Sequence, residues 1–342
     1  MKQYFNSDKN ISTLIVNQCK DDNPLLTFFI PTYKRADTLK DTLNSIQNNH
    51  LNISYQILII DNSANFEKDN KVRELINQYP SLPIDYYINK ENLGMEGNWN
   101  QGLLLSKSEY VSFVHDDDLI SSDYERFISQ IIAILKKNKR CAFFKARYDY
   151  FSKIDDVEQL EKNDGPKKYF YKCTKTSALV NGDNQTYTPS CGMIFKRSVF
   201  LEIGGFNPSF HPSSDNEIGT RLWQNKCYGI ASSWVCGHYR LGLNESMETK
   251  TIQEFVEKNY VIRHNNYQLD FFAKLFSHLF EKYLYSSDID FWIKYAKEKF
   301  DKTILVKELD FKKQYKQYKR RPFFLKVIGK LDAWLCKKYK VI

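Results

Sequence analysis

The 342-residue sequence lacks the features that would mark a secreted, membrane-spanning or zinc-bound protein. Its seven cysteines include no C-x-x-C pair, which argues against a disulfide framework and a zinc knuckle and favours free thiols in a reducing compartment. No apolar run approaches the roughly 20 residues that are needed to span a bilayer. Residues 1–10 are polar and lack the apolar core of a signal peptide. We therefore expect the chain to act in the cytoplasm.

Glycine and proline are also scarce, at 13 and 9 residues, and the composition is that of a globular chain large enough for one or two domains. Charge is distributed unevenly. Residues 294–342 contain 16 Lys or Arg against 5 Asp or Glu, so this segment carries +11 and the rest of the chain −2. A basic segment on a nearly neutral body indicates a partner with negative charge, either a membrane surface or a nucleic acid.

The end of the basic segment has the pattern of an interfacial anchor. Residues 319–322 (Lys-Arg-Arg-Pro) precede a stretch in which Phe, Leu and Trp334 alternate with lysines. A basic helix with Trp and Phe on its apolar side is typical of helices that lie in a membrane surface. The alternative is a helix that packs on the body and leaves a solvated basic face. Nucleic-acid binding is less favoured, because no recognisable reader fold accompanies the charge.

The first two-thirds of the chain alternate apolar strands with amphipathic helices. Continuous apolar strands indicate a sheet that is covered on both faces, which predicts an α/β fold with a mostly parallel central sheet and helices on both faces. After about residue 249 the pattern becomes helical and aromatic, which predicts a helical C-terminal extension. The expected strands are 25–30, 55–60, 84–88, 110–114, 141–151 and 192–195.

Three consecutive carboxylates, Asp116, Asp117 and Asp118, follow the predicted strand at 110–114. Like charges this close repel each other, and a divalent cation would hold them together. Ligands of open α/β sheets bind beyond the carboxyl ends of the strands, so the position agrees with the charge. The alternative is a solvated acidic turn before a helix that begins at Ser121 or Ser122.

Three more polar loops follow strands at the same expected edge of the sheet. They are residues 31–35, residues 61–63 and residues 89–94. Four such loops, each one βα unit apart, predict one shared site. Taken singly, Asp61 could only cap a helix, Arg35 could be a solvated charge, and Asn92 with Gly94 could be a tight turn.

These motifs together resemble the family-2 inverting glycosyltransferases, which have the glycosyltransferase type A fold. The segments on which the resemblance rests are Ile-Pro-Thr-Tyr-Lys-Arg at 30–35, Ile-Ile-Asp-Asn-Ser at 59–63, Asn-x-Gly at 92–94 and the three aspartates after the strand at 110–114. Gly-Gly-Phe at 204–206, Ser-Asp at 214–215 and Tyr-Arg at 239–240 extend the resemblance, which covers about 25–247.

The resemblance implies a role for each matching residue. Asp61 would accept from the uracil ring N–H, Asp116 would hold the ribose, and Asp117 and Asp118 would bind Mn²⁺ or Mg²⁺, which neutralises the leaving diphosphate. Asp215 would be the general base. The remaining implied contacts to the nucleotide sugar come from Pro31, Thr32, Tyr33, Arg35, Asn62, Ser63, Asn92, Gly94 and Asn98, and those on the phosphate and acceptor side from Ser214, His238, Arg240 and Ser246.

The sequence departs from the family pattern at three places. His115 stands where the Asp-x-Asp-Asp motif has its first aspartate, Ser214 replaces the glutamate of the Glu-Asp motif, and Gly242 lies where a histidine is expected. His238 could substitute for that histidine or be a satisfied core residue. Asp215 could instead be a helix cap, and Arg240 and Ser246 could be structural.

The resemblance implies an inverting enzyme that moves a hexose from UDP-glucose or UDP-galactose to a lipid-linked saccharide, in the synthesis of capsule, lipopolysaccharide or another bacterial surface polysaccharide. The catalytic domain would cover 1–248, with a nucleotide-binding half at about 22–150 and an acceptor-side half at about 176–248. The extension at 249–342 would dock the enzyme on the inner face of the cell membrane. Two other classes stay open: a sugar-nucleotide nucleotidyltransferase, although residues 31–35 contain no glycine for a phosphate loop, and a non-catalytic membrane-surface protein.

Overall fold

The computed structural model describes residues 3–6, 10–162, 170–172, 191–242, 249–268, 271–300 and 304. The basic segment predicted to anchor the protein at 319–340 lies outside these residues, as does Ser246. Among the helices that are described, none is both long enough and apolar enough to cross a bilayer.

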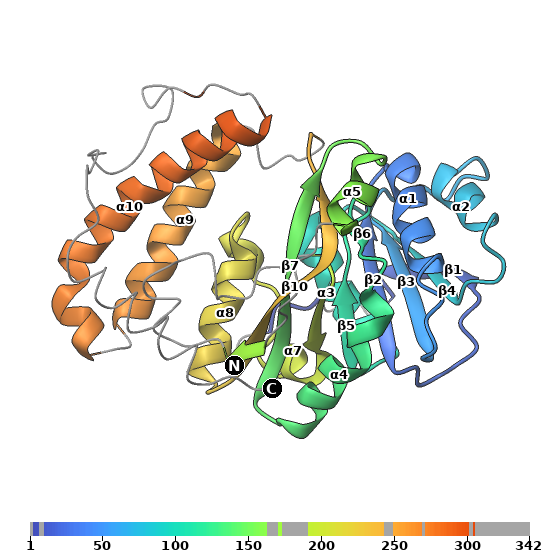
Figure 1. The fold of residues 1–342 in the computed structure, drawn as a ribbon, viewed down its shortest axis with the longest axis horizontal. Helices are drawn as coiled ribbons and strands as arrows, with labels where there is room; N and C mark the ends of the chain where they lie inside the picture. The colour runs from blue at the N-terminus through green and yellow to red at the C-terminus, as the bar shows by residue number, and fades with distance from the viewer. Residues whose placement is uncertain are drawn as a thin grey trace.

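A ten-stranded sheet runs through the described part of the chain (Figure 1). Its strand order is β1-β4-β3-β2-β5-β9-β7-β10-β6, and β8 pairs with β10. The pairs β4-β3, β3-β2, β2-β5 and β7-β10 are parallel, and antiparallel pairs flank them. The strands are β1 Ser12–Asn17, β2 Leu26–Thr32, β3 Tyr55–Asp61, β4 Ile84–Asn89, β5 Tyr110–Phe113, β6 Leu119–Ile120, β7 Cys141–Phe151, β8 Phe170–Lys172, β9 Met193–Lys196 and β10 Tyr228–Arg240.

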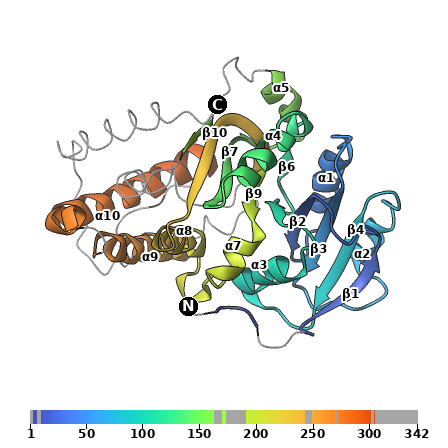
Figure 2. The ribbon, with the colours of Figure 1, turned by 90° about the horizontal axis from the view of Figure 1, so that it is seen from below.

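Helices cover both faces of the sheet, as the continuous apolar strands predict (Figure 2). On one face, α1, α2 and α4 pack on side chains such as Phe28, and on the other α3, α7 and α8 pack on side chains such as Phe29. The predicted α/β class is therefore confirmed. The helices are α1 Ala36–Gln47, α2 Lys71–Ile76, α3 Gly94–Leu105, α4 Tyr124–Lys137, α5 Asp156–Lys162, α7 Arg197–Glu202, the 3-10 helix η1 Pro208–Phe210 and α8 Ser214–Gln224.

The chain changes direction in the sheet between β2 and β5. It winds from β2 through β3 to β4, and then returns through α3 to place β5 on the other side of β2. Where the strand order reverses in this way, a crevice opens at the carboxyl ends of the parallel strands, which is the usual place for a ligand in this class of sheet. The loops after β2 and β5 meet at this point.

The helical C-terminal part consists of α9, Thr249–Gln268, and α10, Phe271–Phe300, which lie side by side beyond α8 (Figure 1). Buried side chains join the two helices, with Val256 on α9 against Tyr285 and Ile289 on α10. Asn216 Nδ2 on α8 donates to Asn259 Oδ1 on α9 at 3.0 Å. The extension therefore rests against the helix that begins with the predicted base.

Candidate functional site

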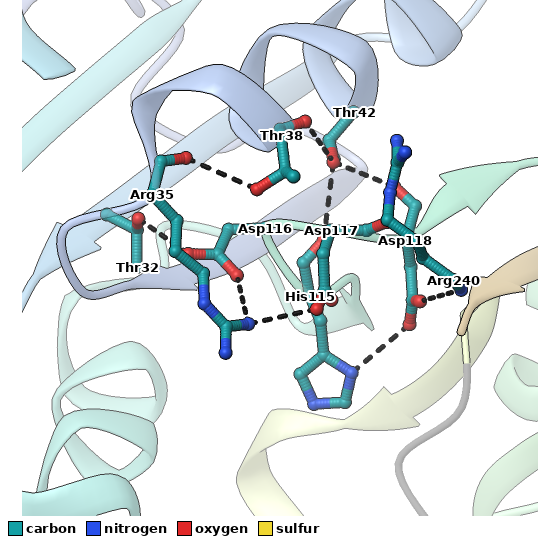
Figure 3. A network of polar contacts seen from close by, with 9 residues as sticks. All are labelled: Thr32, Arg35, Thr38, Thr42, His115, Asp116, Asp117, Asp118 and Arg240. Atoms are coloured by element: carbon teal, nitrogen blue, oxygen red, sulfur yellow. Dashed lines mark hydrogen bonds and ion pairs between the residues drawn. The ribbon is translucent and has the colours of Figure 1, made fainter. Parts of the chain in front are cut away.

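Two of the three consecutive aspartates share one arginine where the loops that follow β2 and β5 meet (Figure 3). Arg35 Nη1 lies 2.9 Å from Asp117 Oδ2 and 3.5 Å from Asp116 Oδ1. Thr32 Oγ1, at the end of β2, donates to Asp116 Oδ2 at 2.7 Å. Asp116 and Asp117 are each only 5% exposed, so this is a buried cluster of negative charge whose two carboxylates face the guanidinium group of Arg35.

Burial and mutual repulsion make the cluster costly to ionise. Burial and the neighbouring charge of Asp117 raise the pKa of Asp116 to about 6, although Thr32 and Arg35 oppose the rise. Burial acts to lower the pKa of His115, but the hydrogen bond and charge of Asp118, with the charges of the other two aspartates, raise it. Added positive charge is therefore stabilised at this loop.

The carboxylate of Asp118 contacts His115 and the backbone of Arg240, not the guanidinium group of Arg35. Its Oδ2 lies 3.2 Å from His115 Nδ1, and its Oδ1 accepts from the backbone N–H of Arg240 at 3.1 Å. Thr42 Oγ1 on α1 donates to the carbonyl oxygen of Asp118 at 2.7 Å. With 0% of its surface exposed, Asp118 fixes the loop in place.

The donor set fits a divalent cation that arrives together with phosphates. Asp116 and Asp117 present carboxylate oxygens to one guanidinium group, and one or two carboxylates completed by phosphate oxygens are a common Mg²⁺ arrangement. No group of three or more His, Cys, Asp or Glu side chains within the described residues is arranged to hold a metal alone. The two carboxylates therefore form at most a partial shell, with Asp118 turned away from it.

Asp61 ends β3 beside Thr32, with which it is paired in the sheet. The side chain is 1% exposed; its Oδ1 accepts from the backbone N–H of Ser63 at 2.8 Å and its Oδ2 from the Tyr86 hydroxyl at 2.9 Å. Burial, with the charge of Asp61, raises the pKa of Tyr86 far above its usual range, so this hydroxyl stays a donor. Two fixed donors hold Asp61 at the predicted base-binding position.

Four asparagines join the end of β4 to the start of α3. Asn62 Nδ2 donates to Asn92 Oδ1 at 2.7 Å and to the carbonyl oxygen of Gly94 at 3.2 Å, while its Oδ1 accepts from Asn89 Nδ2 at 2.9 Å. Asn98 Nδ2 donates to the carbonyl oxygen of Ile60 at 3.2 Å. The predicted contact residues Asn62, Asn92, Gly94 and Asn98 are thus brought together, and the hydrogen bonds among these asparagines shape the loop.

The predicted base Asp215 lies in the first turn of α8 and is partly exposed. Burial raises the pKa of Asp215 to about 7; the backbone N–H of Asn216 and the charge of Lys145 lower it, and the charge of Glu96 raises it. A carboxylate with a pKa near neutrality can accept a proton and release it again, as a general base must. The preceding Ser214 donates to Glu96 Oε1 at 2.8 Å.

The other predicted residues lie at the edges of this arrangement. Pro31 pairs with Ile60 in the sheet, and Tyr33 is 42% exposed beneath Lys34, whose Nζ lies 5.0 Å from the ring centroid. His238 on β10 is 1% exposed and pairs with Leu119 on β6, so it lies inside the sheet. Arg240, two residues further along β10, reaches the aspartate loop.

Three residues of the site were not predicted. Thr42 occupies an otherwise apolar face of α1, Asp41 accepts from Arg240 Nη2 at 2.7 Å, and Glu96 is a buried acid in the first turn of α3. A polar residue at a core position of a helix was the available signal for Thr42. No local pattern marks the other two, because their partners lie more than a hundred residues away along the chain.

Comparison with known proteins identifies relatives that act on sugars. The chain is 33% identical over 100 residues to the abequosyltransferase RfbV of Salmonella typhimurium, covering 29% of this chain and 30% of that protein. It is 31% identical over 100 residues to the GalNAc(5)-diNAcBac-PP-undecaprenol beta-1,3-glucosyltransferase of Campylobacter jejuni, covering 29% of this chain and 31% of the relative. These matches span about a third of each relative.

A solved structure with the same fold is the mannosyltransferase PcManGT from Pyrobaculum calidifontis, in complex with GDP-Man and Mn²⁺. The TM-score is 0.53 at 14% sequence identity, and the match covers 82% of this chain and 77% of that one. Residues 27–204, about half of the chain, match the pattern of the family described as Glycosyl transferase family 2. That segment contains the β2 loop, the asparagine network and the three aspartates, and the chain therefore belongs to glycosyl transferase family 2.

Proposed function

We propose that this protein is an inverting glycosyltransferase that moves a hexose from a nucleoside-diphosphate sugar to a hydroxyl group of a saccharide. The observation that carries the proposal is the buried pair Asp116 and Asp117, held by Thr32 and Arg35 where the loops after β2 and β5 meet. A nucleotide diphosphate with a bound Mn²⁺ or Mg²⁺ ion is the ligand whose charges match such a site.

The chain's own residues supply the parts of a direct displacement. Asp61 and Asp116 would position the base and the ribose, and Asp117 would hold the cation, which would supply Lewis-acid stabilisation of the negative charge on the departing diphosphate. Asp215 takes the proton of the acceptor hydroxyl while the oxygen of that hydroxyl bonds to the anomeric carbon. The bond from that carbon to the diphosphate oxygen breaks on the opposite face, so the configuration inverts.

A uridine nucleotide carrying glucose or galactose is the first donor to test, because the resemblance implies that Asp61 would accept from the N–H of a uracil ring. The acceptor we propose is a lipid-linked saccharide in bacterial surface polysaccharide synthesis. Support comes from the Campylobacter relative, whose name specifies an undecaprenol-linked substrate, and from the +11 charge of residues 294–342. A basic segment of this kind would place the protein at the inner face of the cell membrane.

A thermal-shift screen tests the donor site. Uridine, guanosine, cytidine and thymidine diphosphate sugars would each be added with and without Mn²⁺, to the native chain and to Asp117→Asn. A ligand at about 100 times its Kd stabilises a fold by roughly 2.7 kcal/mol. We expect a Mn²⁺-dependent shift with one donor class that is lost in Asp117→Asn. No shift with any nucleotide sugar would overturn the proposal.

A further inference from the structure

A buried carboxylate on α3 is hydrogen-bonded to the residue that precedes the predicted base. Glu96, in the first turn of α3, is 3% exposed. Its Oε1 accepts from Ser214 Oγ at 2.8 Å and lies 3.1 Å from Nδ1 of His211. Ser214 directly precedes Asp215, so Glu96 is hydrogen-bonded to the turn of α8 that carries the predicted base.

A buried carboxylate in this position costs folding free energy that a neutral side chain would not. Burying an ionised group costs free energy unless it is paired, and a glutamine could accept from Ser214 without that cost. A second acid next to Asp215 also adds repulsion between like charges. His211 and the N-terminal turn of α3 offset part of these costs. A buried acid next to the predicted base, where a glutamine would also satisfy Ser214, therefore points to a role for its charge.

We propose that Glu96 is a positioning residue for Asp215, which holds the first turn of α8 through Ser214, makes Asp215 a stronger proton acceptor through its negative charge, and is balanced by His211 from the preceding loop. This inference rests on the proposed function for its role in turnover. The charge relationship itself can be tested without any activity.

Charged side chains on several helices and strands influence the ionisation of Asp215. Glu96 approaches from α3 and opposes ionisation, and Lys145 approaches from β7 and favours it. His211, with half of its side chain exposed, is available to protons from solvent and offsets Glu96 when it is charged. Of these three groups Glu96 is the one that is buried, and its hydrogen bond with Ser214 fixes its position.

The other charged groups near the first turn of α8 already have partners. Glu217 accepts from Arg221 Nη2 at 2.7 Å on the same helix. On α9, Lys258 Nζ donates to the carbonyl oxygen of Ser209 at 2.6 Å, and the uncharged Asn259 is the residue that bonds Asn216. Replacing Glu96 by glutamine therefore removes one charge from around Asp215 and keeps an acceptor oxygen for Ser214.

The decisive measurement is an NMR titration of the Asp215 carboxyl carbon in the full chain, labelled at aspartate. Its resonance is assigned by its loss in Asp215→Asn. We expect Glu96→Gln to move the Asp215 midpoint to lower pH by about half to one unit, since one negative charge has been removed. Glu109→Gln is the matched control, because Glu109 also accepts from a serine hydroxyl, that of Ser198, at the opposite end of the sheet. A midpoint that is the same in native protein and Glu96→Gln would overturn the proposal.

One further variant, Ser214→Ala, separates the effect of the Glu96 charge from that of its hydrogen bond to Ser214. In turnover assays, the acidic limb of the pH–kcat profile should move with the NMR midpoint in Glu96→Gln. Ser214→Ala removes the hydrogen bond between Ser214 and Glu96 without changing any charge. We therefore expect kcat to fall about 3- to 10-fold while the acidic limb of the pH–kcat profile stays at the same pH. A limb that stays fixed in Glu96→Gln would overturn the positioning role. Absence of turnover in the native chain would instead refute the proposed function, and the titration would still decide the role of Glu96.

Discussion

Arg240 donates from its backbone N–H to Asp118 Oδ1 at 3.1 Å and from its Nε to the carbonyl oxygen of Asp117 at 2.9 Å (Figure 3). The same guanidinium bonds Asp41 on α1 through Nη2 at 2.7 Å and lies over the ring of Phe151. One residue at the end of β10 therefore fixes the loop after β5 and ties it to α1. The loop that carries the three aspartates therefore depends on β10, a strand more than a hundred residues later in the chain.

Replacing Arg240 with alanine should destabilise the fold. The variant loses the bonds to the Asp117 carbonyl and to Asp41 from a side chain that is 11% exposed, which we expect to cost about 2–3 kcal/mol in urea unfolding. Arg126→Ala is the control, because the Arg126 side chain is 75% exposed and lies 4.0 Å from Asp123, a pair expected to contribute under about 0.5 kcal/mol. Equal losses in the two variants would contradict this role.

Removing Arg35 should strengthen the binding of a divalent cation in the absence of nucleotide. Its guanidinium already interacts with Asp116 and Asp117, so a cation must displace it. We expect Arg35→Gln to lower the Kd for Mn²⁺ about 3- to 10-fold, measured by calorimetry. Lys34→Gln removes a neighbouring charge that lies over the Tyr33 ring and should leave the Kd unchanged. Weaker Mn²⁺ binding in Arg35→Gln would show that the arginine does not compete with the ion.

The sequence predicted the central strands well, because they are buried on both faces. Strands β2 and β3 have apolar side chains that pack on helices of both layers, so each reads as a continuous apolar run with no competing helical period. Strand β10 was not predicted. It contains Ser232, Ser233 and Gly237, and shifts of register with β7 break any regular alternation. Its length comes from pairing with β7, not from local preference.

The separate roles of the three aspartates could not be read from their order. Adjacent residues with identical side chains differ here only in what surrounds them, and Asp118 is oriented by Arg240, 122 residues later in the chain. Glu96 is similar, since its partner Ser214 is 118 residues away. Local motifs predicted the edge of the sheet that carries the site. Side-chain direction depends on contacts that no local pattern contains.

Two glycines with positive φ should respond differently to alanine. Gly205 has φ +75°, and a Cβ there would lie 2.4 Å from Asn100 Oδ1. Asn100 bonds both backbone groups of Phe206, so it has little freedom to move. Gly94 has φ +71° with no atom within 4 Å of a Cβ. We expect Gly94→Ala to cost about 1–2 kcal/mol of unfolding free energy from backbone strain alone, and Gly205→Ala to cost at least about 1 kcal/mol more. Equal costs would show that the contact with Asn100 is easily relaxed.

Asp215 should couple activity and stability to pH in opposite directions. Its folded pKa of about 7 lies above the value of about 3.9 expected in the unfolded chain, so the folded state disfavours the ionised form. The stability that the protonated form supplies is full below about pH 4 and is lost as pH rises to about 7. A general base must be ionised, so kcat should rise through the same range.

Asp215→Asn separates the two effects. We expect kcat to fall by about 10²- to 10⁴-fold. At pH 8 the variant should be as stable as the native protein or more stable, by up to about 1–3 kcal/mol, because a disfavoured charge has been removed. Asp155→Asn, at an exposed position before α5, should change neither quantity. Urea unfolding at pH 5 and pH 8, with kcat measured across that range, checks both. A clear loss of stability at pH 8 in Asp215→Asn would show that the carboxylate supports the fold and is not held in an unfavourable ionised state for catalysis.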